Sequence, residues 1–441
     1  MPTRLRGLGR TLRAAVGAPL FREFLRFGSS SIAVQVSRVA SGLMVAALLG
    51  PATWGTWYLL NLIIAYGALT QLGALNGMNR EVPSALGRDD PDEALALRRT
   101  ALGLVLVSTS AVSLLLLLAA WLVPGVVGLS ELVLMLVLLG AHQLFGYATT
   151  SLKATTHFTV VARLHVAMAL TYPLLTISAA WAFGLVGFIV AQVMTYALLC
   201  ALAARSPHVI YRPRFSWPRS RALIAIGFPI MLVGLVNTFF STVDRWVVAA
   251  FLGTEPLGHY SLAIMTLGAV GLLPQVIAQQ FYPRVAFAWS ARGDPDELRR
   301  MAAMHRKLTF LAVIPVVIVL VLVLPSAVRA FLPAYTPGIP ALMVTVFVPL
   351  VSAVGQGYGG ILHMLNRQTW LLAAIIAAAL VNGALSALLV GPFGLVGVAY
   401  GTLLAFALYS GSRVVLGAIA LWRVSSRHPG DVGGAHDGRR A

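Results

Sequence analysis

Long apolar segments alternate with short polar ones along nearly the whole chain. A helix needs about 20 apolar residues to cross a hydrocarbon core of about 30 Å. Twelve stretches of that kind lie at approximately 27–49, 54–78, 100–123, 131–151, 160–181, 184–204, 222–251, 257–281, 306–328, 338–363, 368–389 and 394–420. The pattern therefore predicts an all-α polytopic membrane protein with twelve transmembrane helices.

Basic residues are distributed very unequally among the segments that connect these spans. One set of alternate loops holds nearly all of them, while the other set contains Arg329 alone. The positive-inside rule then places both termini and the basic loops on the cytoplasmic side of the inner (plasma) membrane. An odd number of spans would put arginine clusters on both sides, so the distribution favours twelve spans over eleven or thirteen.

Composition agrees with a chain whose main solvent is lipid. Hydrophobic residues make up 59% of the 441 residues and charged residues 10%, and the net charge of +18 follows the basic loops rather than a nucleic-acid-binding patch. The single cysteine, Cys200, provides neither a disulfide nor a cysteine metal site, and no metal or cofactor is expected. Residues 1–26 are arginine-rich and predict a cytoplasmic segment that is either amphipathic or disordered, and residues 423–441 predict a disordered tail.

Three short segments occur twice in the same order. Leu49–Leu59 matches Leu252–Leu262 at an offset of 203, Asp90–Glu93 matches Asp294–Glu297 at 204, and Phe183–Gly187 matches Phe393–Gly397 at 210. The first resembles a tight turn between spans, the second a helix start, and the third a close helix contact through small residues. Because six spans separate equivalent points, the halves share one orientation, which predicts two six-helix lobes, 27–205 and 206–422, around a central cavity.

Several of these segments resemble the multidrug/oligosaccharidyl-lipid/polysaccharide exporter superfamily, and its polysaccharide flippase branch in particular. The similar residues are Leu49-Gly50-Pro51 with Gly55 and Trp57, Val243-Asp244-Arg245-Trp246 with Gly253, Gly258 and Tyr260, Phe331–Tyr335, and Phe393–Gly397. The resemblance implies a V-shaped pair of six-helix bundles that moves a polyprenyl-diphosphate-linked oligosaccharide from the cytoplasmic to the outer leaflet. It also implies alternating access driven by H+ or Na+, with membrane lipid and polysaccharide synthesis proteins as partners.

Three charged residues lie deep inside predicted spans. They are Arg38 in the first span and Asp244 and Arg245 in the seventh. An ionised side chain at this depth costs about 2.5–3.5 kcal/mol on insertion scales, so each needs a partner or a wet cavity. One hypothesis is that Arg38 and Arg245 bind the diphosphate or an anionic sugar, and that Asp244 carries the coupling ion and faces Arg38 across the cavity. The alternative is a buried ion pair that only fixes packing.

Weaker candidates are polar residues at other positions of the spans. Asn61, Asn237 and Gln275 are candidates for hydrogen bonds to sugars, and equally for contacts between helices. His142 is a candidate for ion coupling, although a lone histidine in a span is more often a packing residue. Arg80, near the cytoplasmic end of the second span, is a candidate for recruiting the diphosphate headgroup, and ordinary snorkelling explains it equally well.

Aromatic residues also gather near the expected outer ends of the spans. Trp54, Trp57, Trp181, Trp246 and Tyr260 fit an aromatic belt at the membrane interface.

Two other functions compete with a flippase. A multidrug exporter of the same fold would bind cations through acidic residues, whereas the deep charges here are two arginines against one aspartate. A membrane-embedded polymerase or ligase would need catalytic groups on a sizeable outer loop, and the predicted outer loops are short and nearly uncharged. The sequence therefore favours a transporter of an anionic substrate over an enzyme.

Overall fold

The computed structural model describes residues 19–122 and 128–426, and within these ranges the chain is helical without a strand. The predicted all-α membrane class is thereby confirmed. The chain divides after Thr238 into two compact units. Most of the predicted N-terminal segment (1–26) and of the predicted tail (423–441) lies outside the described residues.

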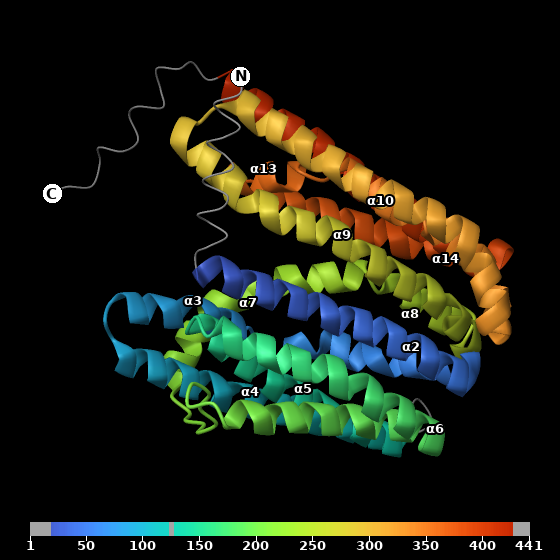
Figure 1. Ribbon diagram of the computed structural model, residues 1–441, viewed down its shortest axis with the longest axis horizontal. Helices are drawn as coiled ribbons and strands as arrows, with labels where there is room; N and C mark the ends of the chain where they lie inside the picture. The colour runs from blue at the N-terminus through green and yellow to red at the C-terminus, as the bar shows by residue number, and fades with distance from the viewer. Residues whose placement is uncertain (1–18, 123–127, 427–441) are drawn as a thin grey trace. The chain divides into compact units, whose positions relative to one another are not determined.

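The first unit contains six helices and most of a seventh. They are α2 (Pro19–Ala65), the 3-10 helix η1 (Tyr66–Gln71), α3 (Ala74–Gly87), α4 (Pro91–Leu122), α5 (Leu129–Ala154), α6 (Phe158–Ala204) and α7 (Trp217–Phe240). Helix α2 packs along α6, and α5 contacts both (Figure 1).

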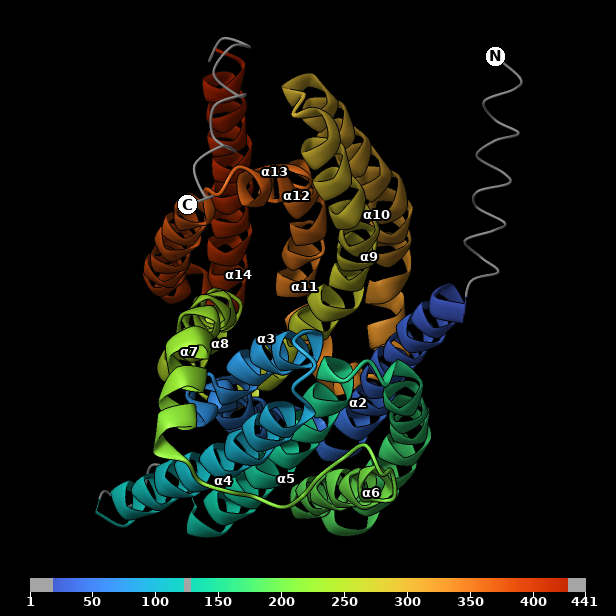
Figure 2. The same cartoon turned by 90° about the vertical axis from the view of Figure 1, so that its left-hand side faces the viewer.

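The second unit holds the remaining elements. They are α8 (Val243–Phe251), α9 (Thr254–Arg292), α10 (Pro295–Phe331), η2 (Pro333–Gly338), α11 (Ile339–Thr345), α12 (Val348–Val354), α13 (Tyr358–Met364) and α14 (Gln368–Ser425). Helices α9 and α10 pack together, and α11, α12 and α13 follow one another beside α14 (Figure 2). The predicted lobe boundary at 205/206 stays a prediction, and in the structure α7 packs with the first unit as far as Thr238.

Three helices are much longer than a single crossing of a bilayer requires. Helices α2 and α6 have 47 residues each and α14 has 58. A straight helix of 47 residues is about 70 Å long, more than twice the hydrocarbon thickness. Each contains one glycine with non-helical φ and ψ, namely Gly50, Gly184 and Gly394. Each long helix is therefore two helical segments that meet at a glycine.

The described residues contain nine helices long and apolar enough to cross a membrane, and these three are among them. Dividing the three at their glycines is compatible with twelve spans, and that number remains a prediction.

Backbone turns occur at equivalent positions of the two units. The pairs of residues with positive φ are Gly50 and Gly253, Asp89 and Gly293, Thr156 and Asn366, and Gly184 and Gly394. Their offsets are 203, 204, 210 and 210, the same values that separate the repeated sequence segments. Gly187 lies directly against the Ala179 carbonyl, and Gly397 against the Leu389 carbonyl in the same way. These matches support the predicted parallel repeat.

The repeated acidic segments begin helices, as the sequence predicts. The amide of Glu93 donates to Asp90 Oδ1 at 2.9 Å at the start of α4. The amide of Asp296 donates to Asp294 Oδ1 at 2.9 Å at the start of α10. In both places the aspartate accepts from an amide that has no partner inside the helix.

Three of the predicted spans are interrupted rather than continuous. The second breaks at η1 and Gly73, the seventh at Ser241 and Thr242 between α7 and α8, and the tenth between α11, α12 and α13. Side chains from other helices stabilise two of these breaks. Gln143 Nε2 donates to the Gly67 carbonyl in η1, and Arg413 Nη2 donates to Ser352 O at 3.2 Å in α12. Hydropathy does not reveal such contacts.

The predicted aromatic belt is wrong for three of its five residues. Trp54, Trp57 and Tyr260 are buried, with exposed fractions of 2%, 6% and 0%. The two tryptophan rings pack edge-on against Phe188 at centroid distances of 5.5 and 4.9 Å. These residues follow the turns at Gly50 and Gly253 closely and face the interior of their own unit. Trp181 and Trp246 are exposed, as a belt requires.

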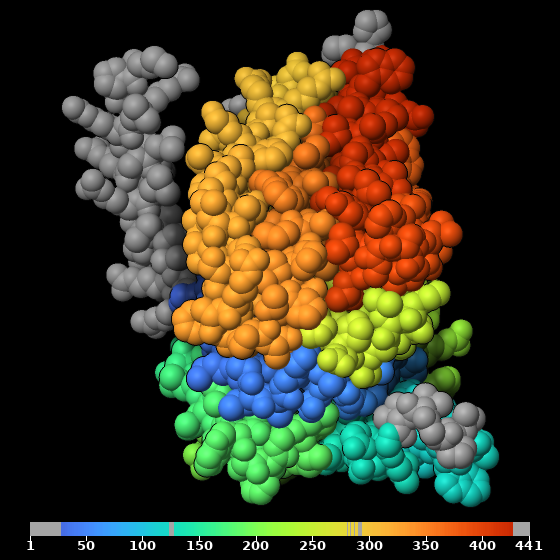
Figure 3. Space-filling model, turned by 90° about the vertical axis from the view of Figure 1, so that its right-hand side faces the viewer, coloured from blue at the N-terminus to red at the C-terminus, as the bar shows by residue number. Residues whose placement is uncertain are grey.

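Helix α10 lies on the surface of the second unit (Figure 3). Its exposed side chains include Leu311, Ile318, Leu322 and Val323. A soluble protein rarely exposes such a run of large apolar residues, and a lipid environment accounts for it.

We predict that Gly227→Ala lowers the thermal stability of the protein in detergent. Gly227 lies against the backbone of Gly73 and Gly77, where a methyl group has no room. Overpacking of this kind costs about 1–3 kcal/mol. Gly234→Ala on the same helix is the matched control, since open space surrounds that glycine. Equal melting temperatures for the two variants would show that the close contact contributes nothing.

Candidate functional site

Arg38 on α2 is held by two phenol rings of α6. Its Nη2 donates to Tyr196 Oη at 2.6 Å, and its guanidinium carbon lies 5.4 Å from the centroid of the Tyr172 ring. Its Nε is buried without a hydrogen-bond partner. In the described part of the chain no carboxylate pairs with Arg38. The side chain is half-buried and keeps its positive charge uncompensated, which suits it to bind an anion.

His142 on α5 lies against the same tyrosine. Its ring meets the Tyr196 ring edge-on at a centroid distance of 5.2 Å, and its Nδ1 is buried without a partner. The structure thus brings together two residues, Arg38 and His142, that the sequence analysis named separately.

Tyr172, Gln192 and Tyr196 complete this polar cluster, and the sequence analysis missed all three. Tyr172 Oη donates to Gln192 Oε1 at 3.4 Å, and Gln192 Nε2 is buried without a partner. We call these three residues with Arg38 and His142 the arginine cluster. It combines a cation with unsatisfied donors inside one unit, which is a suitable lining for an anionic or polar ligand.

Asp244 lies in the first turn of α8 and is only 4% exposed. Tyr260 Oη donates to its Oδ2 at 3.0 Å, and the Arg245 amide donates to its Oδ1 at 2.8 Å. The positive end of the helix dipole also favours a carboxylate at this position. These contacts let Asp244 remain buried at a depth where an ionised side chain is costly.

Further oxygen atoms lie next to Asp244 through Tyr260. Tyr260 Oη is 3.4 Å from Thr402 Oγ1, which donates to Asn382 Oδ1 at 3.5 Å. Ser386 Oγ donates to the same Asn382 oxygen at 3.1 Å, and Asn382 Nδ2 is buried without a partner. We call Asp244, Tyr260, Asn382, Ser386 and Thr402 the aspartate cluster.

The composition of the aspartate cluster indicates what it can bind. The cluster offers one carboxylate and several neutral oxygen atoms, and it contains no histidine or cysteine. Hard cations prefer oxygen ligands of this kind. Among the described residues no group of three or more His, Cys, Asp or Glu side chains is arranged to hold a metal ion.

The two clusters occupy equivalent positions of the repeat. Adding 210 to Tyr172, Thr176 and Gln192 gives Asn382, Ser386 and Thr402, and all six are buried. Polar residues separated by the repeat offset of 210 were therefore the sequence signal from which Tyr172 and Gln192 could have been predicted. Helix α6 in the first unit and helix α14 in the second therefore carry buried polar side chains at equivalent positions. They lie beside a cation, Arg38, in the first unit and beside a carboxylate, Asp244, in the second.

The other predicted residues are not members of the two clusters. Arg245 is half-buried and adjacent to Asp244, and Asn61 is half-buried on α2. Asn237 is exposed and donates to Val233 O of its own helix at 2.8 Å. Gln275 on α9 and Arg80 on α3 are exposed. Because Arg38 and Asp244 belong to different units, their pairing across a cavity remains a prediction.

Arg413 is a further half-buried cation that the sequence analysis missed. It stacks on Tyr409 with its guanidinium carbon 4.6 Å from the ring centroid, and it donates to Ser352 O. The sequence signal was a lone arginine inside the apolar stretch 394–420. Its contacts indicate a structural role at the negative end of α12.

The fold resembles that of known membrane transporters. The structure superposes on the inward-facing form of a multidrug resistance MATE family transporter of the MOP superfamily with a TM-score of 0.72, at 15% identity, over 89% of this chain and 96% of that one. It also superposes on a MOP superfamily transporter from Pyrococcus furiosus with a TM-score of 0.60, at 15% identity, over 91% and 96% of the two chains. At this identity the similarity shows a MATE-like fold and no more.

Sequence comparison identifies the family. Residues 44–334 match the model of a polysaccharide biosynthesis protein family, and the chain belongs to that family. The predicted resemblance to the polysaccharide branch of the MOP exporter superfamily is thus confirmed.

One relative is the probable low-salt glycan biosynthesis flippase Agl15 of Haloferax volcanii, 23% identical over 194 residues. That alignment covers 44% of this chain and 41% of the relative, so the chain matches less than half of the relative's length.

We predict that Tyr196→Phe destabilises the first unit, because it removes the oxygen to which Arg38 donates at 2.6 Å. A buried donor left without its acceptor costs about 1–3 kcal/mol. Thermal unfolding of the purified protein measures the loss. Tyr400→Phe, on an exposed tyrosine of α14, is the control and should unfold like the unaltered protein. An unchanged melting temperature for Tyr196→Phe would mean that the hydroxyl does not hold Arg38.

Proposed function

We propose that this protein flips a polyprenyl-diphosphate-linked oligosaccharide, a precursor of cell-surface polysaccharide, from the cytoplasmic to the outer leaflet by ion-coupled alternating access. The observation that carries the proposal is Arg38, a cation inside a helix bundle that is held by phenols and is paired with no carboxylate among the described residues. Membership of the polysaccharide biosynthesis family and the similarity to a glycan flippase support this substrate class.

In this proposal the diphosphate binds at Arg38. Guanidinium groups match phosphate oxygens in geometry, and water exclusion strengthens the attraction. Gln192 Nε2 and His142 Nδ1, both without partners, then provide polar contacts beside it. Arg245, Asn61, Asn237 and Gln275 are assigned to the sugars or the second phosphate, and Arg80 to the first encounter with the headgroup at the cytoplasmic surface.

Asp244 is assigned to the coupling ion, which is H+ or Na+. A proton or a sodium ion would neutralise its charge and so reduce the free energy of keeping that carboxylate buried. The oxygens of Asn382, Ser386 and Thr402 are of the kind that bind Na+. Coupling requires that the ion and the substrate favour different conformations of the protein, since a ligand shifts an equilibrium only by its differential affinity.

The proposal also places the protein in the inner (plasma) membrane with both termini in the cytoplasm, on the basis of the basic loops. Loading from the cytoplasmic side would then put it next to the proteins that synthesise the lipid-linked glycan.

A multidrug exporter is the second candidate, because the solved structures that share the fold include MATE transporters. Against it, the buried carboxylate Asp244 already accepts two hydrogen bonds, and the candidate residues of the first unit provide a cation. Failure of the glycan-labelling experiment below, together with proton-driven export of a cationic dye, would favour this candidate.

We expect loss of the protein to trap the lipid-linked glycan in the cytoplasmic leaflet of a strain without a redundant flippase. Complementation with Arg38→Gln should fail, whereas Arg329→Gln, which changes a lone exposed arginine, should restore normal export. Leaflet-specific labelling of the glycan measures both. Normal outer-leaflet levels in the deletion strain would rule out the proposed function.

Asp244→Asn should abolish the dependence of transport on an H+ or Na+ gradient in proteoliposomes while substrate still binds. Glu255→Gln is the control, since that acid has a side chain 63% exposed. Combining Asp244→Asn with Arg38→Ala tests the predicted pairing, because residues that interact lose less together than the sum of their single losses. Additive losses would exclude the pair, and a gradient response that survives in Asp244→Asn would exclude the ion site.

A further inference from the structure

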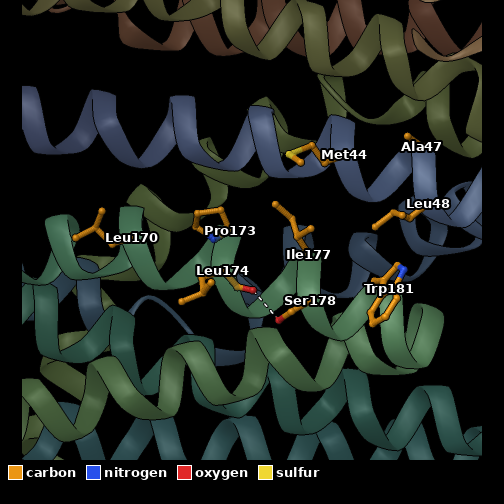
Figure 4. A pocket seen from close by; sticks show the side chains of 9 residues that line it. All are labelled: Met44, Ala47, Leu48, Leu170, Pro173, Leu174, Ile177, Ser178 and Trp181. Atoms are coloured by element: carbon orange, nitrogen blue, oxygen red, sulfur yellow. Dashed lines mark hydrogen bonds between the residues drawn. The ribbon is translucent and has the colours of Figure 1, made fainter.

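An apolar groove of about 750 Å³ lies between α2 and α6 in the first unit (Figure 4). Ser178 carries the one hydroxyl among its lining residues, and it donates to Leu174 O of its own helix at 2.7 Å. Ser37 Oγ of α2 donates at 2.7 Å to Ala169 O, the carbonyl that Pro173 leaves without an amide partner, and ties the two helices together. The walls carry no charge, so nothing in the groove selects one lipid headgroup over another.

A surface of the second unit offers the charge that the groove lacks. Arg367 and Arg423 both lie over the ring of Trp370, with guanidinium carbons 5.0 and 5.3 Å from its centroid. Arg367 directly precedes α14 and Arg423 lies in its last turn, so the start and the end of this long helix meet at one tryptophan. We call these three residues the Arg–Trp–Arg patch.

The Trp370 ring is held in position by an apolar core. Its neighbours on the inner side are Leu362, Leu371 and Ala420. Arg367 and Trp370 are half-buried, and Arg423 is exposed. A cation over an aromatic face keeps its charge and its N–H donors, so the ring presents two guanidinium groups from a fixed place.

The positive charge of the patch has no counter-charge beside it. Two cations at one ring repel each other, so the pair is unfavourable without an anion. Within the ranges that the structure describes, no carboxylate pairs with Arg367 or Arg423. The sequence contains no aspartate or glutamate between Glu297 and Asp431. An anion is therefore what the patch lacks.

The first unit treats the equivalent position differently. His157 precedes α6 as Arg367 precedes α14, at the repeat offset of 210. The ring of His157 stacks on that of His208, in the segment that follows α6, at a centroid distance of 3.6 Å. The first unit thus covers this helix start with its own chain, whereas no described segment follows α14 to cover the patch.

The surroundings of the patch favour a lipid as the source of the anion. The positive-inside rule places the start and the end of α14 at the cytoplasmic face of the membrane. Val415, Ile419 and Arg423 follow one another at intervals of four residues, so they lie along one ridge of the helix, and all three are exposed. A phospholipid with its phosphate at Arg423 would have an acyl chain beside Ile419 and Val415.

We propose that the Arg–Trp–Arg patch binds the phosphate headgroup of an anionic phospholipid of the cytoplasmic leaflet. Guanidinium groups match phosphate oxygens in geometry, and the cytoplasmic leaflet is rich in anionic lipid. One bound phosphate joins the start of α14 to its end. The inference is independent of the proposed function, since it concerns a resident lipid rather than the transported one.

The first test removes the arginines from the full-length protein in neutral detergent. Arg367→Gln and Arg423→Gln should each weaken binding of phosphatidylglycerol about 5-fold, the usual contribution of one arginine beside an anionic lipid surface. Binding of phosphatidylcholine should change far less, because its choline group neutralises the phosphate. Native mass spectrometry at rising lipid concentration measures both affinities.

Arg306→Gln is the matched control for these variants. Arg306 also lies over an aromatic ring of the second unit, 5.9 Å from the centroid of Tyr358, and no other described arginine shares that ring. Its replacement removes the same charge and should leave binding of phosphatidylglycerol unchanged. A loss equal to that of Arg367→Gln and Arg423→Gln would overturn the inference in favour of a general attraction to basic residues.

The second test keeps the charge and removes the ring. Trp370→Leu retains both arginines but not the face that positions them, so it should weaken binding of phosphatidylglycerol about as much as the loss of one arginine. Trp370→Phe retains an aromatic face and should retain binding. Unchanged affinity in Trp370→Leu would overturn the inference, and the arginine variants decide the question alone if Trp370→Leu does not fold.

The last test identifies the source of the anion. Inorganic phosphate, at an ionic strength matched with chloride, should not displace phosphatidylglycerol, because it gains no contact with Val415 or Ile419. Asp431→Asn combined with Asp437→Asn should leave the lipid affinity unchanged, which would exclude these carboxylates as the occupant. Displacement by phosphate, or tighter lipid binding in the double variant, would overturn the assignment to a lipid.

Discussion

The constraint on which this structure depends is that lipid offers no hydrogen bonds to a backbone. Every amide and carbonyl inside the bilayer must find its partner within the protein, so regular helices are the default and each departure needs a specific remedy. Gln143 supplies the remedy at η1, Ser37 at the carbonyl freed by Pro173, and Arg413 at the end of α12. The breaks that result place irregular backbone and polar side chains together inside the helix bundle.

The same scarcity of partners explains the two polar clusters. Arg38 is held by phenols that stabilise a cation without neutralising it, and Asp244 is held by a phenol, an amide and a helix N-terminus. The half-buried Arg38 and the buried Asp244 are thus both held by neutral groups of their own unit. Tyr172 and Gln192 correspond by the offset of 210 to Asn382 and Thr402, so buried polar side chains occupy equivalent positions in the two halves.

The sequence predicted what depends on composition and local geometry. Hydropathy predicted the membrane class, and the repeated segments located the turns at Gly50 and Gly253 and the starts of α4 and α10. The third repeated segment predicted close backbone contacts, which Gly187 and Gly397 make. The sparse charges drew attention to Arg38 and Asp244, and in the structure each lies among polar side chains of its own unit.

What the sequence could not predict depends on neighbours that are distant along the chain. Trp54 and Trp57 occupy positions typical of an interfacial belt, but Phe188 offers them an interior contact. Tyr172, Gln192 and Tyr196 become a site only when α6 packs against α2. The break between α7 and α8 likewise has no hydropathy signal, since Ser241 and Thr242 are ordinary residues of an apolar span.

The position of that break has a mechanical consequence. The covalent passage from the first compact unit to the second falls at Thr238 and Phe239, just before α7 gives way to α8. A rotation of one unit would then be taken up by a few backbone torsions within the membrane rather than by the loop at 205–216. Asp244 lies only a few residues beyond this junction, so the carboxylate proposed to bind the coupling ion is next to the backbone that joins the two units.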